Sequence, residues 1–326
     1  MTDISVVESQ VWFPKGFSFL SGFPTATRKR RMLMPMQAVA DDSGCKGQGA
    51  VVVIAGLVGR AEWWGDFADK WDTCLKESPS IRYFKMYEAA RLNGQFARLS
   101  KRQRDAKLIA LVEVLNSHPF EELYITVDIA AHAKMFGAFY EGRPAPRKKN
   151  RTQHEKDEAT LGNPYFYAYD CFISAACFNL WEAGEREPFE FIVDEHPSLG
   201  ERVKRWYPVV RTIMKEPFRD IMPLDPMPRN DEAFKPLQAA DMLAGLQRMA
   251  AHGDNEFGWL RRHFTIVKPA TRCVHMNEAW FEFIRSLSTP ERREPMSTET
   301  MIQLARMQGA PIPAEGEPWP KKPPSK

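Results

Sequence analysis

The chain contains 326 residues, of which 44% are hydrophobic, 27% charged and 12% aromatic. This composition is typical of a globular protein and excludes wholly disordered, collagenous and coiled-coil classes. Its 45 Lys and Arg residues against 42 Asp and Glu leave a net charge of only +3, which does not indicate a dedicated nucleic-acid coat protein. No apolar run approaches the roughly 18–20 residues needed to span a bilayer, so we expect no membrane segment.

Cysteine usage and the N-terminal residues indicate the compartment. The five cysteines form an odd set without a CxxC pair, which argues against a disulfide framework or a structural zinc site. The opening MTDISVVESQ lacks the apolar core of a signal peptide. We therefore expect a cytoplasmic protein.

The residue pattern divides the chain into three parts. Residues 1–31 show no helical or strand period, end in a basic run, and are expected to be an extension of doubtful structure. Residues 32–287 are predicted to form a single α/β domain, interrupted at 141–156 by a basic, proline-containing insertion. Residues 288–326 are rich in Pro and charge, so most of this tail is predicted to be disordered.

Within the domain, strand and helix patterns alternate. Strands are expected at 36–41, 50–58, 81–87, 123–129 and 189–193, with a short edge strand at 220–224. Helical spacing is expected at 63–75, 101–115, 165–181, 201–214 and 237–250. The short turn between the first two strands predicts an antiparallel hairpin. Ser100 with Gln103 matches a capping box, and Asn163 with Pro164 matches an N-cap. Together these elements predict a mixed sheet flanked by helices.

Three acids lie where ligand sites collect in such a fold. Asp41 and Asp194 each follow an apolar strand, and they should be neighbours if the two strands are adjacent and parallel. Asp241 shares a helix face with small residues that would let the helix approach the sheet closely. An inward-facing carboxylate is costly unless it is paired or binds a metal. The alternative is that each acid is solvated or paired with a basic side chain.

Clustered carboxylates suit Mg²⁺ or Mn²⁺, because these hard cations prefer oxygen ligands. Two such ions could support hydrolysis of a phosphate ester. Motifs of several other enzyme classes, HExxH, GxSxG, Walker A and GxGxxG, are absent from the sequence.

The order of the motifs resembles a bacterial family catalogued as the domain of unknown function numbered 3800. The stretch AVADDSG followed by AVVVIAGLV is similar to that family's opening signature, with Asp42 where the family usually has Glu. The later stretches FIVDEHPS and PLQAADMLAG resemble its other two landmarks, and FKMYEAA with Glu88 matches a less regular segment. The resemblance runs from about Met36 to Arg248.

The resemblance implies a ribonuclease H-like fold, in which the first strands are antiparallel and the later strands parallel, with an acidic two-metal site. It implies Asp41, Asp194 and Asp241 as metal ligands and Glu88 as a fourth catalytic acid. Asp128, at the end of another predicted strand, competes with Asp194 for the place of a catalytic acid. Family members need not be active, since fold does not fix chemistry.

The leading hypothesis is a Mg²⁺- or Mn²⁺-dependent phosphodiesterase, a nuclease acting on DNA or RNA. The basic insertion would contact backbone phosphates through Arg143, Arg147, Lys148, Lys149 and Arg151. Two alternatives stay open. One is a non-catalytic module that binds nucleic acid or a protein, and the other is a metal-dependent hydrolase of a small phosphate ester.

Overall fold

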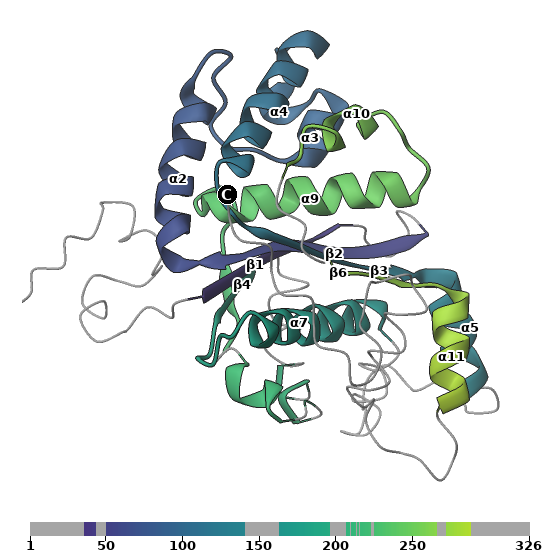
Figure 1. The fold of residues 1–326 in the computed structure, drawn as a ribbon. Coiled ribbons are helices and arrows are strands. Elements are labelled where there is room, and N and C mark those ends of the chain that lie inside the picture. The colour runs from purple at the N-terminus through teal and green to yellow at the C-terminus, as the bar shows by residue number, and fades with distance from the viewer. Residues whose placement is uncertain are drawn as a thin grey trace, which may run out of the picture.

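The strands build one mixed sheet at the centre of the molecule. The computed structural model describes residues 36–43, 50–140, 163–195, 207–208, 210–212, 214, 216–222, 225–265 and 272–287. The strands are β1 (Met36–Ser43), β2 (Val51–Arg60), β3 (Glu121–Asp128), β4 (Glu190–Asp194), β5 (Met227–Arg229) and β6 (Arg272–Met276). They lie side by side in the order β5-β4-β1-β2-β3-β6, and all of them except β5 are labelled in Figure 1.

The pairing directions confirm the predicted fold class. Strand β2 pairs antiparallel with β1 and with β3, which includes the expected hairpin. The later strands are parallel: β4 pairs with β1, β5 with β4, and β6 with β3. This mixed sheet, covered by helices, agrees with a ribonuclease H-like α/β fold.

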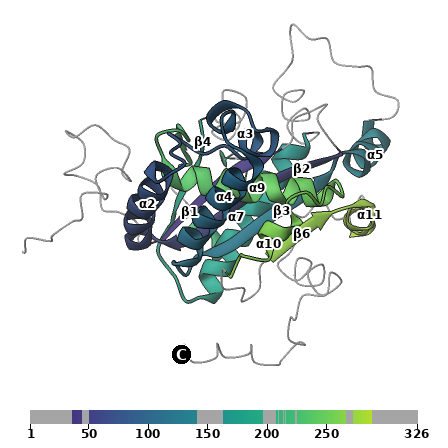
Figure 2. The same ribbon diagram turned by 90° about the horizontal axis from the view of Figure 1, so that it is seen from above.

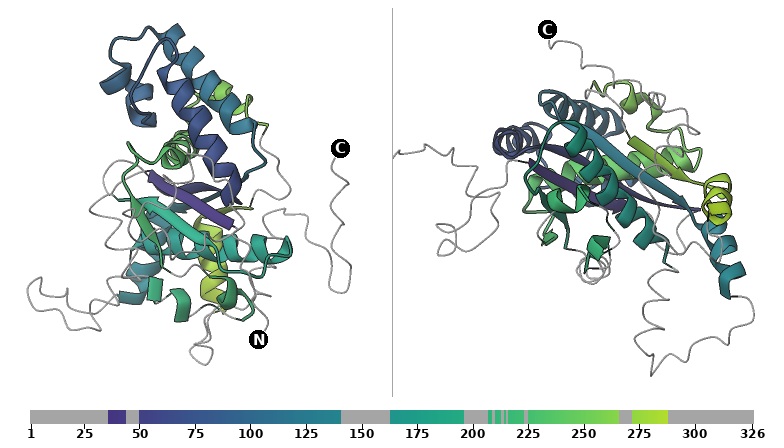
Figure 3. Two further views of the ribbon diagram at one scale, coloured as in Figure 1. Left: turned by 90° about the vertical axis from the view of Figure 1, so that its left-hand side faces the viewer. Right: turned by 60° about the horizontal axis from the view of Figure 1, so that its bottom comes forward.

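Helices cover both faces of the sheet (Figures 1 and 2). One face carries α2 (Ala61–Lys76), α3 (Met86–Arg91), the 3₁₀ turn η2 (Gly94–Phe96), α4 (Lys101–Asn116), α9 (Lys235–Ala251) and α10 (Gly258–Arg261). The other face carries α7 (Pro164–Glu182) and the 3₁₀ turn η3 (Phe218–Ile221). Helices α5 (Ile129–Tyr140) and α11 (Glu278–Leu287) pack against each other at one end (Figure 3).

The two-sided burial explains the long apolar strand patterns. Alternate residues of β1 enter different cores, with Ala38 and Ala40 on the α7 side and Val39 on the α9 side. A strand buried on both faces is apolar nearly throughout, which is what β1 and β2 show. The strands approach closely at Gly56, where an added Cβ would lie 2.1 Å from the carbonyl oxygen of Val39.

Helix starts follow the predicted capping chemistry. Ser100 and Gln103 form a reciprocal capping box at the start of α4. The Asn163 side chain accepts a hydrogen bond from the Tyr165 backbone N–H, and Pro164 occupies the first helical position of α7. These local signals agree with the structure because they depend only on residues within one turn.

Two predicted strands are wrong. Residues 81–85 form an irregular segment that leads into α3, and the backbone N–H groups of Phe84 and Met86 bond to side chains of α9 instead of a neighbouring strand. Phe218–Ile221 forms a 3₁₀ turn, and the edge strand is β5, seven residues beyond the predicted start. An edge position tolerates Pro228, which cannot donate a ladder hydrogen bond. Strand β6 and helices α5 and α11 were not predicted.

Several expectations fall outside the described residues. These are the N-terminal extension 1–31, the basic insertion 141–156, the tail 288–326 and most of the predicted helix 201–214. None of the helices within the described ranges combines the length and apolar character required to cross a bilayer.

Candidate metal centre

Neighbouring parallel strands bring two of the predicted acids together. Strands β1 and β4 pair in parallel, and Ala40 lies opposite Val193. The next residue on each strand is therefore an acid, Asp41 on β1 and Asp194 on β4. The expected adjacency of these two carboxylates is confirmed.

A third acid comes from the next strand along the sheet. Strand β5 pairs in parallel with β4, and Asp231 follows it by two residues. The carboxyl ends of parallel strands meet at one edge of a sheet, where ligands commonly bind. Asp231 therefore joins Asp41 and Asp194 at the same edge.

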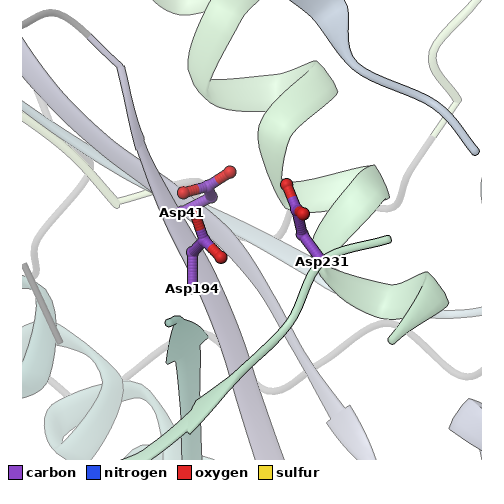
Figure 4. A group of neighbouring side chains, drawn as sticks. All are labelled: Asp41, Asp194 and Asp231. Atoms are coloured by element: carbon purple, nitrogen blue, oxygen red, sulfur yellow. The ribbon is translucent and has the colours of Figure 1, made fainter. Parts of the chain in front are cut away.

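Strand periodicity turns the three side chains toward the same layer of helices. Residues on one strand face alternate with a period of two. Val39 and Ile192 belong to the core beneath α9, so Asp41 and Asp194, two residues further on, share that face. Figure 4 shows the carboxylates of Asp41, Asp194 and Asp231 directed toward one another.

The three carboxylates are close enough to share one ion. One oxygen from each of Asp41, Asp194 and Asp231 lies within 4.8 Å of the other two. Asp41 and Asp231 are buried, and Asp194 is half-buried. A mainly buried set of three carboxylates could hold a metal ion, because hard divalent cations take oxygen ligands of this kind.

The electrostatics of Asp41 show that the site is rich in negative charge. Burial raises the pKa of Asp41 well above its usual 3.8, and the negative charge of Asp241 adds to this effect. Asp42 and Asp194 raise that pKa further. The hydrogen bond from the Asp42 backbone N–H to Asp41 Oδ1, at 2.7 Å, acts in the opposite direction.

Asp241 lies beside the triad rather than within it. Burial raises its pKa to about 7, against the lowering effects of the Met86 hydrogen bond and the Lys85 charge, and the charges of Asp231 and Asp194 also raise it. Its Oδ2 accepts a hydrogen bond of 2.6 Å from the Met86 backbone N–H. Asp241 therefore contributes charge to the site while it fixes the start of α3.

A small residue near Asp241 permits a close approach, but to the 84–86 segment rather than to the sheet as expected. At Gly245, one turn after Asp241, an added Cβ would lie 2.6 Å from Cγ of Met86. The close approach of α9 to the 84–86 segment is what lets the Asp241 carboxylate reach the Met86 backbone. A side chain at position 245 would separate them.

A lysine also enters the site. The Lys85 ammonium forms a short ion pair with Oδ2 of Asp231. Burial alone would lower the pKa of Lys85, but its hydrogen bond to Asp231 and the charges of Asp231, Asp241 and Asp194 raise it. Lys85 thus stays protonated beside the carboxylates.

Gln238 joins the segments that carry Lys85 and Asp231. Its Oε1 accepts hydrogen bonds from Trp71 Nε1 at 3.0 Å and from the Phe84 backbone N–H at 3.1 Å. Its Nε2 donates to the Asp231 carbonyl at 2.8 Å. This buried amide positions both charged residues without contacting either charge.

The structure places the remaining predicted acids elsewhere. Oε1 of Glu88 accepts a hydrogen bond from the Tyr83 hydroxyl, and its Oε2 accepts one from the Gln95 backbone N–H. Glu88 thereby supports the turn at Gly94, whose φ is +51°. Asp128 accepts a hydrogen bond from the Ala131 backbone N–H at the start of α5.

Sequence reasoning missed Asp231 and Lys85. A signal for Asp231 exists: it follows a short extended segment and precedes the helix that begins near Pro236, as an acid at a strand end does. No local pattern identifies Lys85, because its position depends on hydrogen bonds to residues more than 150 positions away. The predicted phosphate-binding residues 143–151 lie outside the described residues.

Comparison with known proteins does not identify the chain. No protein-family model matches it, and a search of curated proteins finds no match.

Proposed function

We propose that this protein is a Mg²⁺- or Mn²⁺-dependent phosphodiesterase, and that its substrate is a nucleic acid. One observation carries the proposal: Asp41, Asp194 and Asp231 converge within 4.8 Å at the carboxyl edge of a ribonuclease H-like sheet. The sequence resemblance to the family of unknown function 3800 supports the same proposal. That the chain belongs to this family is itself part of what we propose.

The chemistry follows from what the residues can hold. A divalent ion bound by Asp41, Asp194 and Asp231 would supply Lewis-acid catalysis for phosphodiester hydrolysis. Lys85 would hold a second positive charge at the site, next to Asp231. Asp241 would keep Lys85 in place through the adjacent Met86 backbone N–H.

A non-catalytic binding module is the second candidate. The Lys85–Asp231 ion pair favours it, because an ammonium already offsets part of the negative charge. In that case the carboxylates would stabilise the fold with Lys85 as their permanent counterion. Metal binding distinguishes the two candidates.

The first test measures the melting temperature in EDTA and in millimolar Mn²⁺ or Mg²⁺. An ion at about 100 times its Kd stabilises the folded state by about 2.7 kcal/mol. For a domain of this size we expect a rise of about 5–10 °C in wild type. The D231N and D41N variants should lose most of this rise.

Asp128→Asn is the matched control, because the same substitution is made at a carboxylate that caps α5. Asn is also a good N-cap, so this variant should keep the wild-type metal response. A wild type without any rise, or a D231N and D41N pair that both keep it, would refute the metal centre.

The second test is a cleavage assay with labelled single- and double-stranded DNA and RNA. Metal-dependent cleavage that D41N abolishes supports the nuclease proposal. Hydrolysis of mononucleotides alone would instead assign a small phosphate ester as the substrate. Metal binding without cleavage of either would favour the binding module.

A further inference from the structure

Helix α9 carries a cation on the same face as Asp241. Residues four and seven positions apart share one side of a helix, which places Gly245 and Arg248 in line with Asp241. At a rise of about 1.5 Å per residue, Arg248 lies about 10 Å along the helix axis from Asp241. The helix therefore extends from the acidic cluster toward a fixed positive charge.

The first strand holds this arginine in position. Arg248 Nε donates a hydrogen bond of 2.9 Å to Oγ of Ser43. Ser43 is two residues beyond Asp41 on β1, so both side chains project from the same face of the strand. Two elements of the acidic site, β1 and α9, thus also fix Arg248.

Most of the hydrogen-bonding capacity of Arg248 remains available. A guanidinium has five N–H donors, and the bond to Ser43 uses one of them. Within the described parts of the chain, no carboxylate lies within ion-pair distance of Arg248, whereas Arg261 pairs with the buried Glu122. The half-buried Arg248 is therefore positioned to receive an anion.

The location of Arg248 in the last turn of α9 has a simpler explanation, which is a favourable interaction with the helix dipole. Any cation satisfies a helix dipole, including lysine. The dipole gives no reason for the directed bond from Nε to Ser43. That bond holds the guanidinium in place through Nε, and the remaining donors of the planar fork can bind a phosphate through two parallel hydrogen bonds.

We propose that Arg248 binds a backbone phosphate of a polynucleotide whose cleaved phosphodiester lies at the acidic cluster. The inference rests on the proposed function and narrows its substrate class to a chain rather than a small phosphate ester. Arg248 is bonded to Ser43, two residues beyond Asp41 on β1, so its guanidinium lies beside the cluster rather than within it. It therefore contacts a phosphate that neighbours the cleaved bond rather than the cleaved phosphate itself.

The test compares substrate lengths in wild type, R248A and R248K. The substrates are fluorescein-labelled DNA and RNA of two and of twelve nucleotides, assayed with Mn²⁺. We expect R248A to lower the ratio of kcat/KM for the 12-mer to kcat/KM for the dinucleotide about tenfold. R248K should fall between wild type and R248A, because it keeps the charge but loses the fork.

Arg186→Ala is the matched control. Arg186 follows α7 on the opposite side of the sheet, where it stacks on Trp181 and donates to backbone carbonyls. This variant should keep the wild-type ratio. Binding of the 12-mer, measured by fluorescence anisotropy from 50 to 200 mM salt, should show a slope of log K against log salt that is smaller by about one in R248A.

The outcomes separate this inference from the metal centre. An unchanged length ratio and salt slope in R248A, with a wild type that binds Mn²⁺ and cleaves the 12-mer, would overturn the role of Arg248 alone. A wild type that responds to Mn²⁺ but neither binds nor cleaves the 12-mer would also overturn it. Loss of the Mn²⁺ response in R248A would show a general structural role and would likewise contradict the inference.

Discussion

Removing the charge of the half-buried Asp241 should stabilise the metal-free protein. Asp241 lies among the carboxylates of the site with its pKa raised to about 7 by burial and by the charges of Asp231 and Asp194. Asn at this position keeps an oxygen that can accept the hydrogen bond from the Met86 backbone N–H. The D241N variant therefore loses the charge while it keeps the contact that orders α3.

The size of the effect depends on pH. A carboxyl whose folded-state pKa exceeds its unfolded-state pKa binds more protons when folded, so the free energy of unfolding falls as pH rises between the two values. For Asp241 the unfolded-state pKa is 3.8 and the folded-state pKa is about 7. The difference corresponds to about 4 kcal/mol, since one pH unit is worth about 1.4 kcal/mol.

Without metal, we expect D241N to gain little stability at pH 3.5 and about 1–2 kcal/mol at pH 5. At pH 8 the expected gain is up to about 4 kcal/mol, which raises the melting temperature by about 2–4 °C per kcal/mol. Urea unfolding in EDTA at the three pH values measures this directly. Added Mn²⁺ should reduce the advantage, because an ion offsets the same repulsion in wild type.

The D128N variant is again the matched control, because its carboxylate is outside the cluster. The difference in stability between D128N and wild type should not increase with pH in this way. A D241N protein that is equally destabilised at pH 5 and pH 8 would refute the reasoning. That result would mean that the hydrogen bond to Met86 requires a charged acceptor and outweighs the repulsion.

Two further predictions concern the neighbours of the cluster. Lys85→Met should lower the Mn²⁺ concentration that gives half of the maximal melting-temperature rise, because the ammonium paired with Asp231 competes with the ion. An unchanged or higher concentration would show that Lys85 does not occupy the ion's position. Gly56→Ala should destabilise the protein by about 3 kcal/mol or more. The new Cβ would lie 2.1 Å from the Val39 carbonyl oxygen and 2.8 Å from the Ala40 Cα. Overpacking against backbone atoms cannot relax by a side-chain movement. Urea unfolding measures the second effect, and a loss below about 1 kcal/mol would contradict it.

The parts of the fold that could be predicted are those with local causes. The capping box at Ser100 and the N-cap at Asn163 each depend on nearby residues, and each agrees with the structure. The adjacency of Asp41 and Asp194 could be anticipated because parallel strands end at a common edge.

The missed features depend on contacts that are distant in sequence. Residues 81–87 were predicted to form a strand, yet Gln238 and Asp241 supply the hydrogen-bond partners that a neighbouring strand would otherwise provide. Strand β5 has only three residues and contains Pro228, so no periodicity marks it or the acid that follows it. Asp231 was missed because the strand before it was not recognised, and Lys85 because hydrogen bonds to the distant helix α9 set its position.

The acidic cluster contains more negative than positive charge. Four carboxylates influence one another here, those of Asp41, Asp194, Asp231 and Asp241, and the cation among them is Lys85. Burial is the largest cause that raises the pKa of Asp41 well above its usual value and that of Asp241 to about 7, and the neighbouring carboxylates add to it. Lys85 lowers the pKa of Asp241 but does not offset these effects. A divalent ion would replace the protons of these carboxyls, and its affinity should therefore increase with pH up to about 7, which a permanent lysine counterion would not explain.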